Sequence, residues 1–183
     1  MAKSFSALNE QHQRFIAEQH VFFVGTATAD SRVNVSPKGL DTLRVLGPDR
    51  VIWLNLTGNG NESAAHVQVD SRMTLLFCAF SGNALILRVY GRARVVHPYD
   101  PDWRELSGHF PAQPGARQVF DLTVDLVQSS CGHAVPLMSY ERDRDQLAAW
   151  AAAKGEAGIQ QYWHERNQQS IDGIDTHIVD HRR

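Results

Sequence analysis

Short β-forming runs separated by turn residues dominate the middle of the chain, and they constrain its fold more than any other feature. They lie at residues 21–28, 33–36, 43–46, 51–56, 72–80, 84–96 and 118–128. Most connections are short and contain Gly, Pro, Asn or Asp. Strands joined by short turns pair in antiparallel fashion, because a parallel pair needs a crossover of a dozen or more residues. The pattern therefore predicts a mostly antiparallel barrel or sandwich.

Two details of the predicted strands can be tested directly. Pro37 is expected to end the regular pairing of the run at 33–36, because proline donates no backbone hydrogen bond. Polar and apolar residues alternate in the run at 118–128, which predicts that Leu126 shares the apolar face with Phe120 and Leu122.

The turn Gly47-Pro48-Asp49-Arg50 separates two apolar runs and predicts a hairpin.

Helical patterns flank the β-rich part of the chain. Residues 6–19 form an amphipathic pattern with Ser6 as its expected N-cap, and residues 100–109 predict a short helix. Residues 144–167 predict one or two helices, interrupted around two glycines. We expect residues 1–183 to form a single domain of mostly β (α+β) class. A helix at 6–19 and a helical C-terminal extension at 144–183 would flank its barrel.

Charge and composition exclude several classes of protein. The 18 Lys and Arg nearly balance the 20 Asp and Glu, for a net charge of −2, so bulk charge cannot hold a nucleic acid. No apolar run approaches the ~20 residues that a membrane span needs. Residues 1–20 contain no apolar signal-peptide core, and Cys78 and Cys131 form no CxxC pair. We therefore expect a cytoplasmic protein that binds no nucleic acid and no membrane.

The loop Thr57-Gly58-Asn59-Gly60-Asn61-Glu62 is the most informative local motif, because it connects a predicted strand to a predicted helix. Backbone N–H groups at a helix N-terminus, together with the helix dipole, favour an anion. The alternative is a glycine-rich turn with an Asn cap. The motif is not a Walker loop, since no Gly-Lys-Ser/Thr ends it. Cations for a phosphate would have to come from elsewhere.

Two further segments offer polar groups within apolar surroundings. Ser36-Pro37-Lys38-Gly39 supplies a hydroxyl group, a cation and a permissive glycine, although such a tetrapeptide also occurs in ordinary loops. Arg88 interrupts the apolar run 85–90, so it either faces outward or points into a site. Both segments are candidates for supplying the missing cations.

Cysteine and histidine offer weaker signals. Cys131 and His133 would form a reactive pair if the chain bends at Gly132, but a buried cysteine closing a strand is the favoured interpretation. Cys78 lies in an apolar run and is expected in the core. The nine histidines show no metal-ligand spacing beyond the weak pair His177 and His181, so no metal site is expected.

Taken in order, these segments resemble the pyridoxamine 5′-phosphate oxidase-related, FMN-binding split-barrel family. The resemblance covers roughly residues 15–130, and it rests on five segments together. They are Val33 to Gly39, the hairpin strand 51–56, the loop 57–62, the run from Asp70 to Phe77 and the run from Leu85 to Ala93.

The resemblance implies an antiparallel split barrel that forms a homodimer, with FMN in a cleft between the subunits. The phosphate would lie toward the loop and the following helix, and the isoalloxazine over the barrel strands. The implied cofactor-binding residues are Ser36, Lys38, Gly58, Asn59, Asn61, Glu62, Ser63 and Arg88. No catalytic residue is singled out, because the flavin itself carries the hydride.

Two departures from the family pattern refine the expected function. Oxidases proper resemble Ser-Arg-Lys where this chain has Asn61-Glu62-Ser63, and their C-terminal Arg-Leu-x-x-Arg motif is absent. We therefore expect an FMN-dependent oxidoreductase that acts on a small organic substrate and is not a genuine vitamin B6 oxidase. The alternative is a non-catalytic, stress-related protein that binds flavin or haem in the same cleft.

Overall fold

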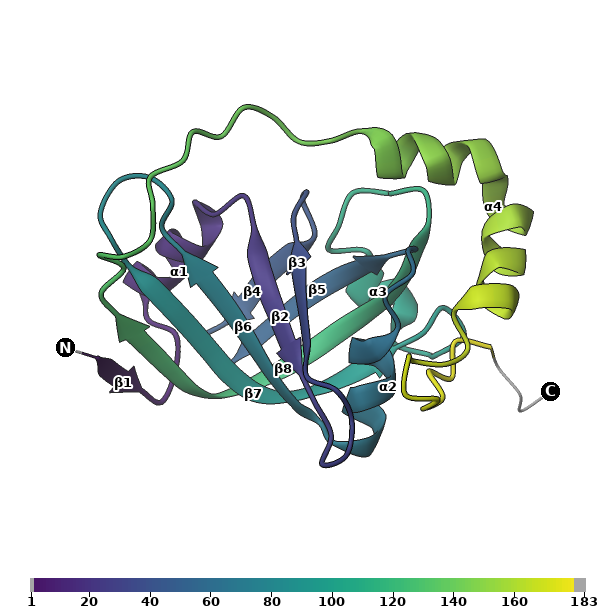
Figure 1. Ribbon diagram of the computed structural model, residues 1–183, viewed down its shortest axis with the longest axis horizontal. Helices are drawn as coiled ribbons and strands as arrows, with labels where there is room; N and C mark the ends of the chain where they lie inside the picture. The colour runs from purple at the N-terminus through teal and green to yellow at the C-terminus, as the bar shows by residue number, and fades with distance from the viewer. Residues whose placement is uncertain (1, 180–183) are drawn as a thin grey trace.

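The computed structural model describes residues 2–179, which contain eight strands and four helices (Figure 1). The strands are β1 Lys3–Phe5, β2 Phe22–Thr26, β3 Asn34–Lys38, β4 Leu43–Gly47, β5 Arg50–Leu56, β6 Arg72–Cys78, β7 Ile86–Val96 and β8 Ala116–Ser130. The helices are α1 Glu10–Ala17, α2 Glu62–Val69, α3 Trp103–Ser107 and α4 Gln146–Arg166. Every predicted β-run contains a strand, and the predicted hairpin is formed by β4 and β5.

All strand pairs are antiparallel and belong to one sheet, in the order β3-β2-β6-β7-β8-β5-β4, with β1 added to the end of β8. The long strands β7 and β8 curve around the molecule and pair along most of their length (Figure 1). Strands β3 and β4 are consecutive in sequence, yet they stand at opposite ends of this order. The sheet is therefore an open, split barrel, which confirms the predicted fold class.

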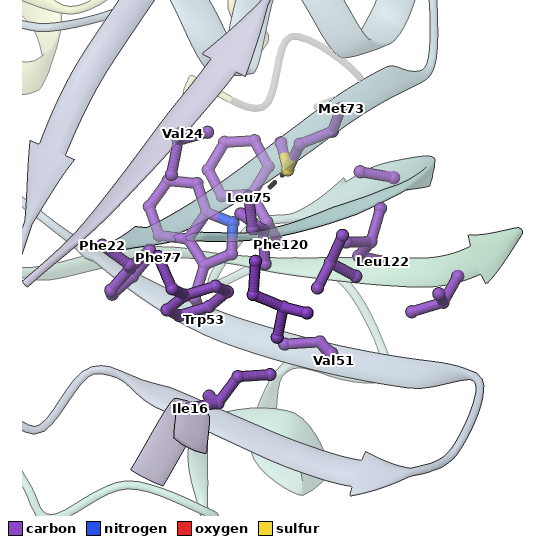
Figure 2. Packing of buried hydrophobic residues seen from close by; sticks show 14 of the residues in the cluster. Ile16, Phe22, Val24, Val51, Trp53, Met73, Leu75, Phe77, Phe120 and Leu122 are labelled. Atoms are coloured by element: carbon purple, nitrogen blue, oxygen red, sulfur yellow. Dashed lines mark hydrogen bonds between the residues drawn. The ribbon is translucent and has the colours of Figure 1, made fainter. Parts of the chain in front are cut away.

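The inner face of the sheet is filled by large apolar side chains, among which Trp53 is central (Figure 2). Its ring stacks on Phe120 at 4.3 Å and meets Phe22 edge-on at 6.2 Å. The indole Nε1 donates to the sulfur of Met73, so the one polar atom of this buried ring has a partner. Alternation along the strands places these side chains inside, and on the outer face Ile52, Leu54 and Val119 form a second buried cluster against α3.

Two predicted element boundaries differ from the structure. Helix α1 begins after Asn9, whose side chain accepts a hydrogen bond from the His12 amide, so Asn9 and not Ser6 is the N-cap. Pro37 does not end the pairing of β3, since it lies opposite Phe23 inside the ladder. Strand β3 is at the end of the sheet order and has one neighbouring strand, so the missing N–H of proline breaks no second ladder.

The predicted orientation of Leu126 is wrong, because β8 contains a bulge. The register between β7 and β8 shifts between Tyr90 and Gly91, so that Tyr90 pairs with Leu126 and Gly91 with Val124. The extra residue, Asp125, reverses the alternation from that point on. Val127 is consequently buried, whereas Leu126 is 39% exposed on the outer face.

The C-terminal part is helical over only some of residues 144–183. The predicted interruption of α4 lies at Gly155, whose φ of 65° and ψ of 173° separate two helical halves. After Arg166 the chain leaves the helix and turns back over the loop that precedes α2 (Figure 1). Residues 180–183 lie outside the described range. Within residues 2–179, no helix is both long enough and apolar enough to span a membrane.

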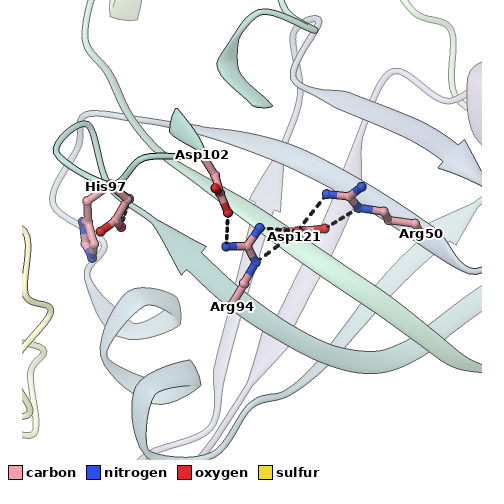
Figure 3. A network of polar contacts seen from close by, with 6 residues as sticks. Arg50, Arg94, His97, Asp102 and Asp121 are labelled. Carbon is pink, nitrogen blue, oxygen red and sulfur yellow. Dashed lines mark hydrogen bonds and ion pairs between the residues drawn. The ribbon is translucent and has the colours of Figure 1, made fainter. Parts of the chain in front are cut away.

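A charged network braces the outside of the barrel where β5, β8 and β7 run side by side (Figure 3). Asp121 accepts two hydrogen bonds from Arg50, at 2.9 and 3.0 Å, and two more from Arg94. Arg94 also donates to Asp102 at 2.7 Å, just before α3. Burial alone would raise the pKa of Asp121, but the hydrogen bonds from the two arginines outweigh it and hold the pKa below its ordinary value.

Candidate functional site

The loop 57–61 connects β5 to α2, as the sequence predicts, but its polar groups face other parts of the chain. The Asn61 amide donates to the Glu62 carboxylate at 2.9 Å, so Glu62 caps the start of its own helix. The Asn59 side chain accepts a hydrogen bond from the Tyr162 hydroxyl group. The carboxylate at the start of α2 therefore has a hydrogen-bond donor within the chain.

A buried arginine lies under this loop and holds its carbonyl groups. Arg117, at the start of β8, donates to the carbonyl oxygens of Gly58 and Gly60 at 3.1 and 2.6 Å and to the Asn61 side chain at 3.4 Å. Its side chain is nearly inaccessible, and burial lowers the pKa of Arg117 to about 10, against opposing effects of Tyr162 and Glu62. The loop therefore turns its carbonyl groups toward a cation of the chain.

The other side of the loop is covered by residues 162–176, which we call the C-terminal clasp. Asn167 donates to the Gly58 carbonyl and to the Asn61 side chain, each at 2.9 Å. Asn61 in turn donates to the carbonyl oxygens of Arg166 and Gln169 at 2.9 and 3.0 Å. The clasp thus adds hydrogen bonds to the Gly58 carbonyl and to the Asn61 side chain, and anion binding by the loop amides stays a prediction.

The clasp also reaches the start of β3 and the acid of α2. Both the backbone amide and the guanidinium of Arg32 donate to the Asp172 carboxylate, and these hydrogen bonds hold the pKa of Asp172 below its ordinary value. The Ile171 amide donates to Glu62 at 3.3 Å. Two acids and one exposed cation are therefore arranged at this edge of the barrel.

Alternate residues of β3 form a polar row on its inner side, and this row meets the first turn of α2. Asn34 donates to Ser63 at 3.1 Å and to Thr26 at 3.2 Å, and Ser36 donates to Asn34 at 2.9 Å. The fully buried His66 contacts Thr26 through its Nδ1 at 3.1 Å. Among the described residues, the Nε2 of this histidine has no hydrogen-bond partner.

Lys38 ends the polar row and points into the barrel. Its Nζ donates to the Asn55 side chain at 3.3 Å and lies 5.3 Å from the centre of the Trp53 ring. Burial, the largest cause, and the positive charge of Arg117 lower the pKa of Lys38 to about 8, against the opposing effect of Glu62. This amine is therefore a weak base compared with an ordinary lysine.

An open groove of about 430 Å³ lies over strands β2, β6 and β7, with Asp125 of β8 at one end. Its lining residues are Gly25, Thr26, Ala27, Val33, Arg72, Met73, Thr74, Tyr90, Gly91 and Asp125. Gly25 leaves room, since an added Cβ there would meet its nearest atom, the Cβ of Thr74, at 3.7 Å. Gly91 has a structural role, because a Cβ would come within 2.0 Å of the Thr123 carbonyl oxygen.

The structure gathers most of the sequence-predicted cofactor-binding residues at one end of the barrel. Ser36, Ser63 and Lys38 belong to the polar row or contact it, and the four residues 58–62 that were singled out lie under the clasp. Arg88 lies apart from them, facing outward from β7 with its guanidinium donating to Ser130 at 3.2 Å. That these residues bind a flavin stays a prediction.

The two cysteine expectations are wrong. Cys131 is exposed, because it follows the last residue of β8 and does not close a buried strand. Cys78 is only partly buried, since it alternates with the core residue Phe77 and so faces out of the barrel. Within residues 2–179, no three metal-ligating side chains come together. His181, one half of the weak histidine pair, lies outside the described residues.

Sequence reasoning missed four residues that shape this region: Asn34, His66, Arg117 and Asn167. The alternation of Asn34, Ser36 and Lys38 along one strand was a usable signal, because side chains two residues apart share a face. No comparable signal marks Arg117 or Asn167. Their partners are 56 and 106 residues away in sequence, and only the folded chain brings them together.

Comparisons with known proteins agree with this architecture. The chain is 29% identical to the pyridoxamine 5′-phosphate oxidase family protein ustO of Aspergillus flavus over 190 residues, which cover 93% of this chain and 76% of that protein. A solved Lactobacillus delbrueckii protein described as a pyridoxamine 5′-phosphate oxidase has a TM-score of 0.53 at 22% identity. That match covers 67% of this chain and 94% of the other.

HupZ of Group A Streptococcus has the same fold, with a TM-score of 0.50 at 16% identity over 65% of this chain and 91% of that one. The family model described as pyridoxamine 5′-phosphate oxidase matches residues 8–131, which include every strand from β2 to β8 and the loop under the clasp. With the split barrel and this match together, the chain belongs to the pyridoxamine 5′-phosphate oxidase family.

Proposed function

We propose that this protein is a flavin-dependent oxidoreductase that acts on a small organic substrate and uses FMN as its flavin. One observation carries the proposal. The open groove over β2, β6 and β7 shares Thr26 with the polar row, which leads to the first turn of α2. An apolar groove next to a polar cluster at a helix start is the arrangement that a flat ring with a phosphate tail requires.

The residues present fit such a ligand in the groove better than under the clasp. Gly25 has no side chain to fill the bottom of the groove. Tyr90 and Val33 supply apolar surface, and Arg72 is the cation in the lining. Ser63 lies in the first turn of α2, near the Thr26 end. The loop 57–61, by contrast, is closed by Arg117 and the clasp. The proposed site therefore places the ring in the groove and the phosphate toward Ser63.

A bound flavin supplies hydride transfer, and the protein's residues bind and orient it. Thr74 and Tyr90 border the groove with polar atoms, and Asp125 adds an acid at one end. Glu62 and Ser63 stand where the oxidases proper resemble Arg-Lys, and Asn61 and Glu62 are used internally for the clasp and the helix cap. This use supports a function other than vitamin B6 oxidation.

We further propose that the protein acts in the cytoplasm as a homodimer, with the cofactor between the subunits. Val33, in the groove lining, is 74% exposed, Val35 of the adjoining strand β3 is 65% exposed, and Leu126 lies on the same sheet. Apolar side chains around an open groove are typical of a surface that a partner covers. The second subunit would then supply the other wall of the site.

The experiment is flavin binding to the purified protein, measured by the visible spectrum and by titration with FMN, FAD and riboflavin. The variant Gly25→Val adds a side chain to the groove floor, where the new Cβ meets its nearest atom at 3.7 Å, and Thr123→Val is the control on the outer face of β8. Wild type and T123V should bind FMN, and G25V should bind it at least about tenfold more weakly, with an unchanged melting temperature. If the wild type takes up no flavin, the proposal fails.

A stable flavin spectrum without any turnover would instead support a non-catalytic binding protein. Substrate oxidation is therefore measured alongside binding, with oxygen and with NAD(P)H as redox partners. An oxidoreductase should show flavin bleaching on addition of a donor and recovery in air.

A further inference from the structure

Lys38 is placed differently from the other lysines of the chain, which are Lys3 and Lys154. Lys3 is exposed in β1, and Lys154 lies on α4 against the rings of Trp150 and Tyr162. Lys38 alone extends into the barrel, where its Nζ rests over the Trp53 face and contacts one neutral amide oxygen, that of Asn55. In the described structure, no carboxylate forms an ion pair with it.

The surroundings of Lys38 favour a neutral amine. The Trp53 ring and the Asn55 side chain replace part of the water around the amine, and the buried cation Arg117 repels a second positive charge. A lysine pKa of about 8 leaves about a quarter of the amine neutral at pH 7.5, against about one part in a thousand for an ordinary lysine. Neutral amines are the form that attacks carbonyl carbon.

The amine is also within reach of solvent. Lys38 is only partly buried, and it is the last residue of β3, which has one neighbouring strand in the sheet order. The exposed Pro37 precedes it, and Gly39, without a side chain, follows.

From this arrangement we propose that Lys38 is a carbonyl-reactive amine that forms an imine with small aldehydes. The nitrogen lone pair attacks the carbonyl carbon to give a carbinolamine, as one proton moves from nitrogen to oxygen. The C–O bond then breaks and the C=N bond forms. The two hydrogens of the amine leave with the oxygen as water, and no oxidant or reductant takes part. The proposal is independent of flavin binding.

The test uses propionaldehyde as the probe, with sodium cyanoborohydride to trap the imine as a secondary amine, followed by peptide mass spectrometry. The three lysines provide internal controls in a single sample. At pH 7.5 Lys38 should be alkylated at least about tenfold faster than Lys3 and Lys154. Its rate should level off above about pH 8, whereas the rates of the other two lysines should continue to rise toward pH 10.5.

The variant Lys38→Arg keeps a positive charge and removes the nucleophile, so labelling at residue 38 should vanish while Lys3 and Lys154 label as before. Equal labelling of all three lysines, or a Lys38 rate that keeps rising to pH 10.5, would overturn the proposal. Flavin titration of K38R in parallel separates this result from the flavin proposal, since the aldehyde reaction is measured on flavin-free protein.

A second measurement does not depend on the probe reaching the amine. Because the folded state favours the neutral amine, the unfolded chain binds more protons between pH 8 and 10.5, and the free energy of unfolding should rise with pH in that interval. The variant Lys38→Met should remove this rise between about pH 8 and 10, above which Arg117, with its pKa of about 10, adds a rise of its own. If wild type and K38M show the same pH dependence there, the environment that the proposal requires is absent.

Discussion

The side chains of Asn61 and Asn167 are joined by a hydrogen bond of 2.9 Å, although 106 residues separate them. Asn167 also donates to the Gly58 carbonyl, and Asn61 donates to two carbonyl groups of the clasp. The two asparagines thus link the loop to the clasp, and their hydrogen bonds make the loop and the clasp a single structural unit.

Replacing Asn167 by Ala should loosen the loop 57–61 and the clasp together. The variant removes two donated hydrogen bonds and leaves buried acceptors on the loop, which we expect to cost about 1–3 kcal/mol of unfolding free energy. Hydrogen exchange should speed up together in residues 57–62 and 166–176. Gln168→Ala is the control, because the Gln168 side chain donates to the His164 carbonyl at the end of α4 and not to the loop. Faster exchange confined to the C-terminus would contradict the coupling.

Arg117→Lys should destabilise the loop although it keeps the charge. The guanidinium reaches the carbonyl groups of Gly58 and Gly60 with two different nitrogens, a fork that a single ammonium group cannot reproduce. We expect a loss of about 2–4 kcal/mol, because a buried charge remains with fewer partners. Chemical denaturation of R117K measures the loss. A value within 0.5 kcal/mol of wild type, on the order of a surface substitution, would show that the loop does not depend on this arginine.

Gly91→Ala and Gly25→Ala form a matched pair on neighbouring parts of the same sheet. The Cβ at residue 91 would lie 2.0 Å from the Thr123 carbonyl oxygen, whereas the Cβ at residue 25 meets nothing closer than 3.7 Å. G91A must therefore displace β8 at its bulge and should cost about 3 kcal/mol or more. G25A should stay within about 1 kcal/mol of wild type. Melting temperatures compare the two, and similar values would contradict the close approach of β7 and β8.

The strands were predictable from the sequence because each depends on local alternation and on turn residues that stand beside it. The orientation of Leu126 was not, since the bulge at Asp125 is set by how β7 pairs with β8 and leaves no mark in the alternating pattern. In the candidate site, too, some features follow from the local sequence and others depend on tertiary packing. The row Asn34, Ser36 and Lys38 follows from strand periodicity.

Which groups face the loop at 57–61 could not be read from the loop itself. Its glycines and asparagines are equally suited to an anion and to an internal polar network. The choice is made by Arg117 and Asn167, which approach from β8 and from beyond α4. Such contacts depend on tertiary packing, so a motif alone does not determine whether backbone groups are free for a ligand.

Asp121 should make the stability of the barrel sensitive to acid. The pKa of Asp121 in the folded state lies below the ordinary 3.8. Its contribution to the free energy of unfolding is therefore present above pH 3.8 and is lost as the pH falls toward the folded-state pKa. Asp121→Asn removes the charge and leaves Arg50 and Arg94 without their shared partner. We expect a loss of about 2–3 kcal/mol at pH 7, less than for a fully buried pair because both arginines are partly exposed.

The difference in unfolding free energy between wild type and D121N should become smaller as the pH is lowered from 5 to 2. This range spans about 3.9, the pKa of an unperturbed Asp. At low pH the wild-type carboxylate takes up a proton and resembles the amide. Asp102→Asn is the matched control. It breaks one half-exposed pair with Arg94 and should cost less than about 1 kcal/mol. Urea denaturation at several pH values measures all three proteins. A D121N deficit that stays constant down to pH 2, where about 99% of an ordinary Asp is protonated, would mean that the aspartate acts through packing and not through its charge.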